Sequence, residues 1–277
     1  PFAHLPPRAR CVRGLPQGRL RRWTDNEMRM NVTSMSSRAC VAPFSSLGFF
    51  WPTGLGLLAV LAWDSSGGDL ALARLMGDSR GFYLAGNPVL TVFLHTGARY
   101  LSWLAAALVM AAVVKPWGLF KAFPRADLFW AASTTLLCAL LVSLVKHASL
   151  TSCPWDLALF GGTVPYVSHW QWSGDGGPGG CFPAGHASSA FAFLPFYFLV
   201  AQASPPNVRR ARACLAGVLV AGSILGLAQQ LRGAHFMSHT LWTAWLCWTL
   251  AGGSWLLRER YRRRRPDRAA VRSRAGA

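Results

Sequence analysis

Long apolar runs, separated by short polar segments, dominate the pattern of hydrophobic and polar residues along this chain. A helix needs about 20 apolar residues to cross the hydrocarbon core of a bilayer, with about 17 as the lower end. Five runs without Asp, Glu, Lys or Arg reach that length, and a shorter sixth is extended by the weakly polar residues before it. In chain order the runs are Val41–Trp63, Tyr100–Val114, Leu128–Val145, Ala187–Val208, Ala213–Leu231 and Gly233–Leu257. The pattern predicts an all-α polytopic membrane protein with six transmembrane helices in one bundle.

The composition also favours a membrane protein. Hydrophobic residues make up 52% of the chain and charged residues only 14%, against about 25% charged residues in an average soluble protein. A soluble helical core is the alternative interpretation. It is the weaker one, because so many apolar runs of this length are hard to bury in one globule.

Basic residues are concentrated in segments that the predicted topology places on one side of the membrane. The net charge is +18, and more than half of the 28 basic residues lie before Val41 or after Leu257. The loops Lys115–Arg125 and Arg209–Arg212 are also basic, whereas the loop His147–Gly185 contains no Lys or Arg. Because cytoplasmic loops are enriched in Lys and Arg, both termini are predicted to be cytoplasmic. Basic tails next to apolar runs suit anionic lipid, so we expect no nucleic-acid partner.

The segment between the first two apolar runs is mixed in character. Asp64–Arg99 predicts an interfacial helix, a turn at Asn87-Pro88 and a helix that leads into the second span. His95 lies on the apolar part of that last helix and is interpreted as a packed or interfacial side chain. The predicted parts of the chain are a basic disordered segment at residues 1–40, a six-helix membrane domain at 41–257 and a basic cytoplasmic tail at 258–277.

Three polar stretches lie at the ends of apolar runs. The first is Lys146–Asp156, the second is Cys181–His186 and the third is Gln229–His239. Ionisable residues next to lipid are costly and are functional candidates by default. The predicted topology brings all three stretches to the outer face of the membrane, so they are expected to form one site.

The residue types in these stretches suit phosphoryl transfer. One neutral imidazole can act as a nucleophile and another as a general acid. Lysine, arginine and a backbone N–H at the start of a helix bind anions well. The large outer loop has only Asp156 and Asp175 as acids and lacks a carboxylate pair suited to magnesium. The stretches therefore indicate a phosphohistidine mechanism without a cofactor.

The order and spacing of the stretches resemble the type 2 phosphatidic-acid phosphatase superfamily, over about Asp64–Leu257. The family pattern is Lys-x6-Arg-Pro, then Pro-Ser-Gly-His, then Ser-Arg-x5-His-x3-Asp. Lys146 with Pro154 fits the first motif. Pro183-Ala184-Gly185-His186 fits the second, and Gly233-Ala234-His235 fits the core of the third. The resemblance implies a six-helix membrane phosphatase.

The chain departs from the family pattern at several positions. Cys153 stands where the first arginine is expected, and Ala184 replaces the serine of the second motif. In the third motif Gln229 stands at the arginine position, Arg232 lies three residues later, and His239 replaces the aspartate. These departures are similar to those of a divergent bacterial branch with CPWD, FPAGH and RGAHF signatures.

The resemblance implies a role for each site residue. His235 would be the nucleophile and His186 the acid that protonates the leaving group. His239 would orient His235 or pack as a buried polar residue, and Asp156 is a further candidate for an orienting role. The candidates for phosphate binding are Lys146, the N–H of Gly185, and Arg232.

Other interpretations of the same residues stay open. His235 and His239 share one helix face at i, i+4 spacing, and His186 would be a third ligand of a metal site. A non-catalytic lipid-phosphate binding or transport protein and a lipid phosphotransferase are alternative functions. A structural interpretation without catalysis is also open. In it the histidines would be core residues with satisfied hydrogen bonds, Lys146 would extend its ammonium to the membrane interface, and Arg232 would bind lipid headgroups.

The seven cysteines fall into different settings. Cys138, Cys214 and Cys247 lie within apolar runs and are interpreted as packing residues. Cys153 and Cys181 lie in the outer loop, one beside each of two motifs, where an oxidising compartment permits a disulfide. We predict this disulfide, with two separate thiols as the alternative.

The sequence thus predicts a phosphatase of the bacterial inner membrane with its active site on the periplasmic side. Its partners would be the bilayer and a lipid that carries a phosphomonoester or pyrophosphate. Phosphatidate, phosphatidylglycerophosphate, a polyprenyl pyrophosphate and lipid A all remain open as substrates. The oligomeric state is also open.

Overall fold

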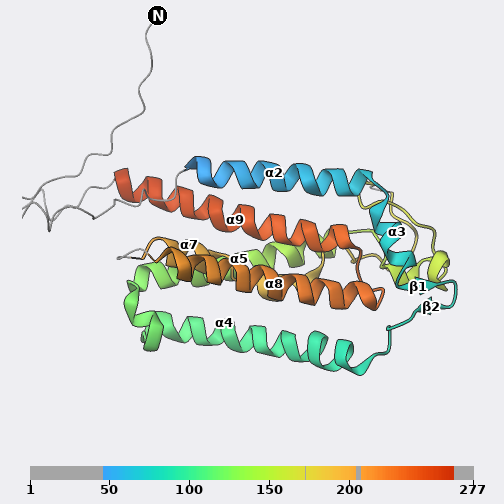
Figure 1. Cartoon of the computed structure of the whole chain (residues 1–277), viewed down its shortest axis with the longest axis horizontal. Coiled ribbons are helices and arrows are strands. Elements are labelled where there is room, and N and C mark those ends of the chain that lie inside the picture. Colours follow the sequence, from blue (N-terminus) through green and yellow to red (C-terminus); the bar gives the residue numbers. More distant parts are fainter. Residues whose placement is uncertain (1–45, 172, 204–206, 265–277) are drawn as a thin grey trace, which may run out of the picture. The chain divides into compact units, whose positions relative to one another are not determined.

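A computed structural model describes residues 46–171, 173–203 and 207–264 and is mostly helical (Figure 1). The prediction of a mainly helical protein is confirmed. The basic segment at residues 1–40 lies outside the described residues. The α-helices are α2 (Ser46–Ser65), α3 (Gly68–Arg74), α4 (Ala98–Val114), α5 (Arg125–Ala148), α6 (Gly185–Phe191), α7 (Pro195–Ala201), α8 (Val208–Leu231) and α9 (Met237–Arg264).

Shorter elements join these helices. A π-helical segment leads directly into α4, as the turn at Asn87-Pro88 predicted. A two-stranded antiparallel hairpin, which the sequence pattern does not predict, follows α3. The shorter elements are β1 (Gly77–Asp78), β2 (Gly81–Phe82), η1 (Val89–Gly97), η2 (Gly118–Ala122), η3 (Pro154–Asp156) and η4 (Ala158–Phe160).

Several helices are compatible with a membrane-spanning role. Within the described residues three helices are long and apolar enough: Val89–Val114, Arg125–Ala148 and Val208–Leu231. A fourth span results if α2 and α3, which are bent by 64° at their junction, count as one. The apolar helix Gly185–Ala201 is shorter than these. The six predicted spans therefore stay a prediction.

A core of aromatic and small side chains holds α5, α6, α7 and α9 together. Phe198 of α7 is buried and stacks on Trp255 of α9, with ring centroids 5.7 Å apart. Glycines let aromatic rings approach helix backbones directly: a Cβ at Gly222 would overlap the Phe191 ring, and a Cβ at Gly252 would overlap a neighbouring phenylalanine ring. Close packing of this kind fixes α8 against α6 and α9 against α2.

Tryptophan side chains of α9 fasten this helix to α2, which lies beside it in Figure 1. The indole N–H of Trp242 donates to Asp64 at 2.9 Å. The indoles of Trp245 and Trp248 donate to the carbonyl and the hydroxyl of Thr53 at 3.0 and 2.8 Å. An apolar neighbour alone could not satisfy these buried indole donors.

The first turn of α9 is capped by a residue from α3. The Asp69 carboxylate accepts from the Ser238 N–H at 2.9 Å and also from the Ser238 hydroxyl. The Trp63 indole donates to the same carboxylate at 2.7 Å. A carboxylate at a helix N-terminus satisfies unpaired N–H groups and interacts favourably with the helix dipole. This cap fixes the turn of α9 that carries His239.

The loop between α5 and α6 is irregular but packed. Asp175 accepts from the N–H and hydroxyl of Ser152, both at 2.7 Å, and from the Gly177 N–H at 3.0 Å. Burial alone would raise the pKa of the Asp175 carboxyl, but these hydrogen bonds lower it on balance. Apolar side chains of the loop pack against β2 and the third polar stretch. The loop therefore has its own ordered structure next to the three polar stretches.

Candidate active site

Backbone hydrogen bonds join the three polar stretches to one another. The N–H of Trp155 in the first stretch donates to the Gly233 carbonyl of the third at 2.9 Å. The N–H of Ala184 in the second stretch donates to the His239 carbonyl at 3.1 Å. The Cys181 N–H closes the set by donating to a carbonyl of the first stretch at 3.0 Å. Segments separated by up to 80 residues are thus held as one unit.

Lys146 and Gly185 lie side by side. Lys146 is in the last turn of α5, and Gly185 begins α6. A Cβ at Gly185 would lie 3.5 Å from Cδ of Lys146, so the lysine stem runs along the start of α6. The Lys146 ammonium donates to the Gly180 carbonyl. The Lys146 side chain therefore lies beside the start of α6, an arrangement that suits anion binding.

His186 follows in the first turn of α6 and stacks on His95 of η1. The two ring centroids are 3.7 Å apart and the rings are inclined by 24°. Nε2 of His186 is buried and has no hydrogen-bond partner among the described residues. A buried polar atom without a partner is costly, so this nitrogen is available to a ligand.

A cavity of about 490 Å³ lies between α4, α5 and α6. At its polar end are Lys146, Gly185 and His186, together with Arg99 of α4. Serine and threonine side chains also reach it, but most of its wall is apolar. The apolar lining residues are Trp103, Ala106, Leu136, Ala139, Ala192 and Phe193.

His235 and His239 form a buried pair. His235 lies in the turn between α8 and α9, a turn that uses Gly233 at a φ of 79°, and His239 lies in the first turn of α9. Their Nδ1 atoms are 3.4 Å apart, so one donates and the other accepts. When His235 donates, its Nε2 keeps a free lone pair. Burial holds the pKa of His235 well below its usual range, and the charges of His239, Lys146 and His186 act in the same direction.

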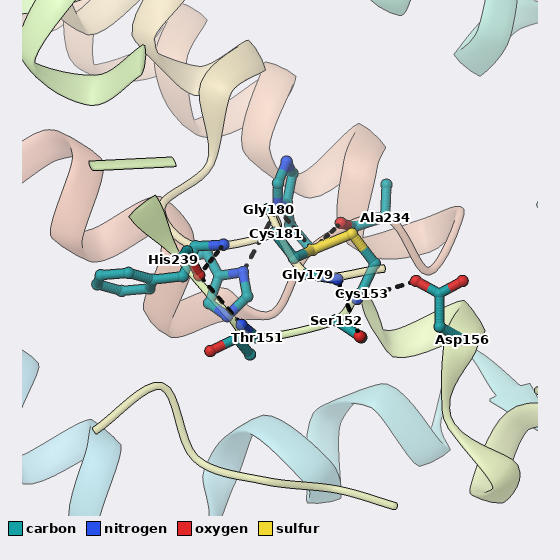
Figure 2. Close-up of a disulfide and its surroundings, with 12 residues drawn as sticks. Thr151, Ser152, Cys153, Asp156, Gly179, Gly180, Cys181, Ala234 and His239 are labelled. Atoms are coloured by element: carbon teal, nitrogen blue, oxygen red, sulfur yellow. Dashed lines mark hydrogen bonds between the residues drawn. A yellow bond between two sulfur atoms is a disulfide. The ribbon is translucent and has the colours of Figure 1, made fainter. Parts of the chain in front are cut away.

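Figure 2 shows the disulfide between Cys153 and Cys181, whose Cα atoms are 5.1 Å apart. It joins the first and second polar stretches at the position where the family has an arginine. Cys181 Sγ lies 3.5 Å from Nδ1 of His235 and 3.0 Å from the Ala234 carbonyl oxygen. A sulfur bridge, with no charge, thus lies against the buried histidine pair.

His239 and Asp156 lie on opposite sides of this disulfide (Figure 2). The Asp156 carboxylate accepts from the Cys153 N–H at 3.0 Å and closes the short helix η3. Its contact in the structure is therefore with the backbone of the first stretch. The candidate orienting residue that lies next to His235 is His239.

Arg232 is held by Gln229, the residue that stands where the family pattern has an arginine. Its guanidinium donates to Oε1 of Gln229 at 3.1 Å and to the Ala85 carbonyl at 3.4 Å. Gln229 thus positions an arginine that comes from three residues further along the chain.

An aromatic stack covers the other side of His239. The His169 ring lies parallel to the Phe182 ring, with centroids 4.2 Å apart, and meets His239 edge-on at 6.0 Å. His169 Nε2 is 3.3 Å from the Asp64 carboxylate. The outer loop therefore covers His239 on this side, and the side chain is 1% exposed.

Two residues near the site lie outside the three polar stretches. His95, predicted to be a packed or interfacial side chain, packs on His186. Arg99 belongs to no motif of the sequence, yet it lies at the polar end of the cavity. The i, i+4 spacing of His95 and Arg99 places both on one face of a helix. This spacing was the signal in the sequence that would have found them.

The fold and site define a mostly helical protein in which histidines, Lys146 and Arg232 gather near the ends of the helices. The sequence model of the PAP2 superfamily matches residues 127–263, which include all three polar stretches. This chain belongs to the PAP2 superfamily, and the predicted family membership is confirmed. Membership indicates a phosphatase that acts on phosphate esters. Neither curated proteins nor solved structures give a significant match.

Proposed function

We propose that the protein hydrolyses a phosphomonoester or pyrophosphate on a membrane lipid through a phosphohistidine. The observation that carries this proposal is the cavity, whose polar end holds Lys146 and His186 and whose remaining wall is apolar. A phosphate would occupy the polar end and the lipid chain would lie along the wall. The backbone contacts that join the three polar stretches support a shared role.

The reaction would take two steps. Nε2 of His235 attacks phosphorus, and the P–N bond forms as the P–O bond to the leaving group breaks. His186 gives its proton to the departing oxygen. Water then attacks the phosphohistidine and gives a proton to His186, the P–N bond breaks, and inorganic phosphate leaves. Lys146, Arg232 and the Gly185 N–H bind the phosphate oxygens throughout, since fixed donors stabilise the charge that develops there.

His239 takes the place of the family aspartate in this mechanism. Its Nδ1 accepts the Nδ1 proton of His235 across 3.4 Å. That hydrogen bond selects the His235 tautomer whose Nε2 lone pair is free. A neutral acceptor suits this position, because the disulfide and the aromatic stack keep water away from it.

The proposed topology has six spans in a bacterial inner membrane. They are α2, η1 with α4, α5, α6 with α7, α8, and α9. The basic loops and both termini would face the cytoplasm, and the three polar stretches would face the periplasm. Lipid would then reach the cavity between α4, α5 and α6 from within the bilayer.

Phosphate release by the purified protein from a panel of lipid phosphates tests the proposal, with a short-chain soluble phosphomonoester for comparison. We expect turnover of at least one lipid, full activity in EDTA and inhibition by vanadate. A protein-bound phosphate that is labile in acid and stable in base would identify the intermediate. Activity that EDTA abolishes and zinc restores would contradict the mechanism.

A further inference from the structure

We propose that Cys181, His235 and His239 form a zinc site when the disulfide between Cys153 and Cys181 is reduced. The ligand atoms of the three residues all lie within 4.8 Å of one another, and all three residues are buried. Cys153 and Cys181 lie in the outer loop and the two histidines come more than 50 residues later, so the fold alone assembles the set. The site does not depend on the phosphatase proposal.

Two of the three distances between these atoms agree with tetrahedral zinc. Bonds of about 2.3 Å to sulfur and 2.0–2.1 Å to nitrogen put two nitrogens about 3.3 Å apart and sulfur about 3.6 Å from nitrogen. The Nδ1 atoms of His235 and His239 are 3.4 Å apart, and Cys181 Sγ is 3.5 Å from Nδ1 of His235. The third distance, from Cys181 Sγ to the ring nitrogen of His239, is at most 4.8 Å, so zinc would draw these two side chains closer together once the disulfide is broken.

The oxidation state of Cys181 decides whether the site exists. In the disulfide its sulfur carries no charge and is a poor ligand, because zinc binds thiolate. A dithiol reductant breaks the S–S bond: each sulfur gains one electron and one proton, and the dithiol becomes a disulfide. Zinc then displaces the Cys181 proton, and water or the freed Cys153 sulfur takes the fourth position.

Zinc at this site would switch off the proposed reaction, and this consequence alone rests on the proposed function. Coordination uses the Nδ1 lone pair of His235 and leaves the ring proton on Nε2, the atom that must attack phosphorus. His186, which the sequence offered as a third metal ligand, stacks on His95 instead and is not a member of this cluster. The metal would be an inhibitor and not a catalyst.

Two matched variants separate the site from a general effect of losing the disulfide. Cys153→Ser and Cys181→Ser both abolish the bridge, and each leaves a single thiol from the pair. We expect cobalt, as a spectroscopic substitute for zinc, to bind Cys153→Ser. The result should be a thiolate-to-cobalt charge-transfer band and the intense visible bands of tetrahedral cobalt. Cys181→Ser and the oxidised wild type should show neither, and adding zinc should bleach the bands.

Two further measurements keep the test decisive. Wild-type protein treated with a phosphine reductant should acquire the same spectrum, which makes the result independent of any folding defect in the variants. His239→Ala in the Cys153→Ser chain should lose the bands at the same cobalt concentration. Equal spectra for the two cysteine variants, or no cobalt binding by Cys153→Ser and by the reduced wild type, would overturn the site.

The activity assay then tests the consequence separately. Zinc should inhibit Cys153→Ser and reduced wild type, EDTA should restore their activity, and oxidised wild type should be insensitive. Cobalt binding without an effect on turnover would leave the metal site standing and count against the role of His235 in the proposed function.

Discussion

The two histidines to which the proposed mechanism assigns the roles of nucleophile and acid lie in opposite surroundings. His235 is 6% exposed, its Nδ1 has two close neighbours in His239 and Cys181, and a disulfide and a packed loop close around it. His186 is more exposed, lies at the polar end of a cavity of about 490 Å³, and leaves Nε2 without a partner among the described residues. Neighbouring side chains therefore fix the His235 ring, whereas Nε2 of His186 can accept a contact from a ligand.

This difference matches what the two steps demand. A nucleophile must present one tautomer and one lone pair, which a closed and dry environment secures. A general acid must exchange protons with a leaving group and with water, so it needs access. In this mechanism the closed half of the site, around His235, serves the nucleophile, and the open half, around His186, serves the general acid.

The largest effect is expected at the closed half. His235→Ala should lose at least about 10²- to 10⁴-fold of the phosphatase activity, since general acid–base catalysis alone contributes that much and a lost nucleophile should cost no less. The loss should be the same for every leaving group. Initial rates measure it, with the exposed His147 as the control in His147→Ala. Near-normal turnover in His235→Ala would remove His235 from its role.

The open half should respond to the leaving group. His186→Ala should lose about 10²- to 10⁴-fold on an alkyl phosphate, the range for general acid catalysis. The loss should be clearly smaller on an aryl phosphate, because a phenolate needs little protonation to depart. The ratio of the two rates is the measurement. A ratio equal to that of the wild type would show that His186 is not the acid.

A smaller effect is expected at His239. His239→Ala should reduce kcat on the order of tenfold, because a buried hydrogen bond contributes about 0.5–1.5 kcal/mol, while KM changes little. His239→Asp restores the residue of the family pattern and should retain more activity than His239→Ala. Steady-state kinetics on both variants decide the matter. Equal activity in the two would assign His239 a packing role only.

The smallest effect concerns stability and pH. Folding lowers the pKa of His235 well below its usual range, because the ring is buried. Below about pH 6.5 the His235 ring is therefore protonated in the unfolded chain but stays neutral in the folded protein. The stabilising effect of the neutral ring is complete above that pH and is lost as the pH falls, by at most about 1.4 kcal/mol per unit for one group.

Denaturation midpoints at pH 7.5 and 5.5 in detergent measure this slope. His235→Gln should flatten it, because glutamine does not titrate. An identical slope in the wild type and in His235→Gln would mean that His235 does not contribute to it.

The helices of this fold were largely predictable from local pattern. The apolar run Leu128–Val145 becomes α5, Arg125–Ala148, and the run Ala213–Leu231 becomes the larger part of α8, Val208–Leu231. Apolar stretches encode such helices locally, and flanking polar residues extend them by a few positions. The run Ala187–Val208 was less well predicted, because its helix is interrupted between α6 and α7, a break that the apolar pattern does not mark.

Only those residues of the site that belong to sequence motifs with a recognisable spacing were predictable. His186 and His235 stand in recognisable patterns, so their common location followed from topology. The His95 ring beside His186, the Gln229 side chain that holds Arg232, and the Asp69 cap on α9 depend on contacts between residues that no local pattern relates. Such contacts form only when the helices pack.

The Asp69 cap and the indole hydrogen bonds to Asp64 and Thr53 also concern a further question, namely how much of the chain is needed for α9 to fold. The segment that defines the family, residues 127–263, contains α9 but neither α2 nor α3, which supply these acceptors. Cut to that segment, the chain would keep its histidines and lose the acceptors that fix the first turns of α9. Protease resistance of this fragment beside the whole chain would reveal the difference. We therefore expect that the matched segment does not fold by itself and that α2 and α3 are needed to complete its structure.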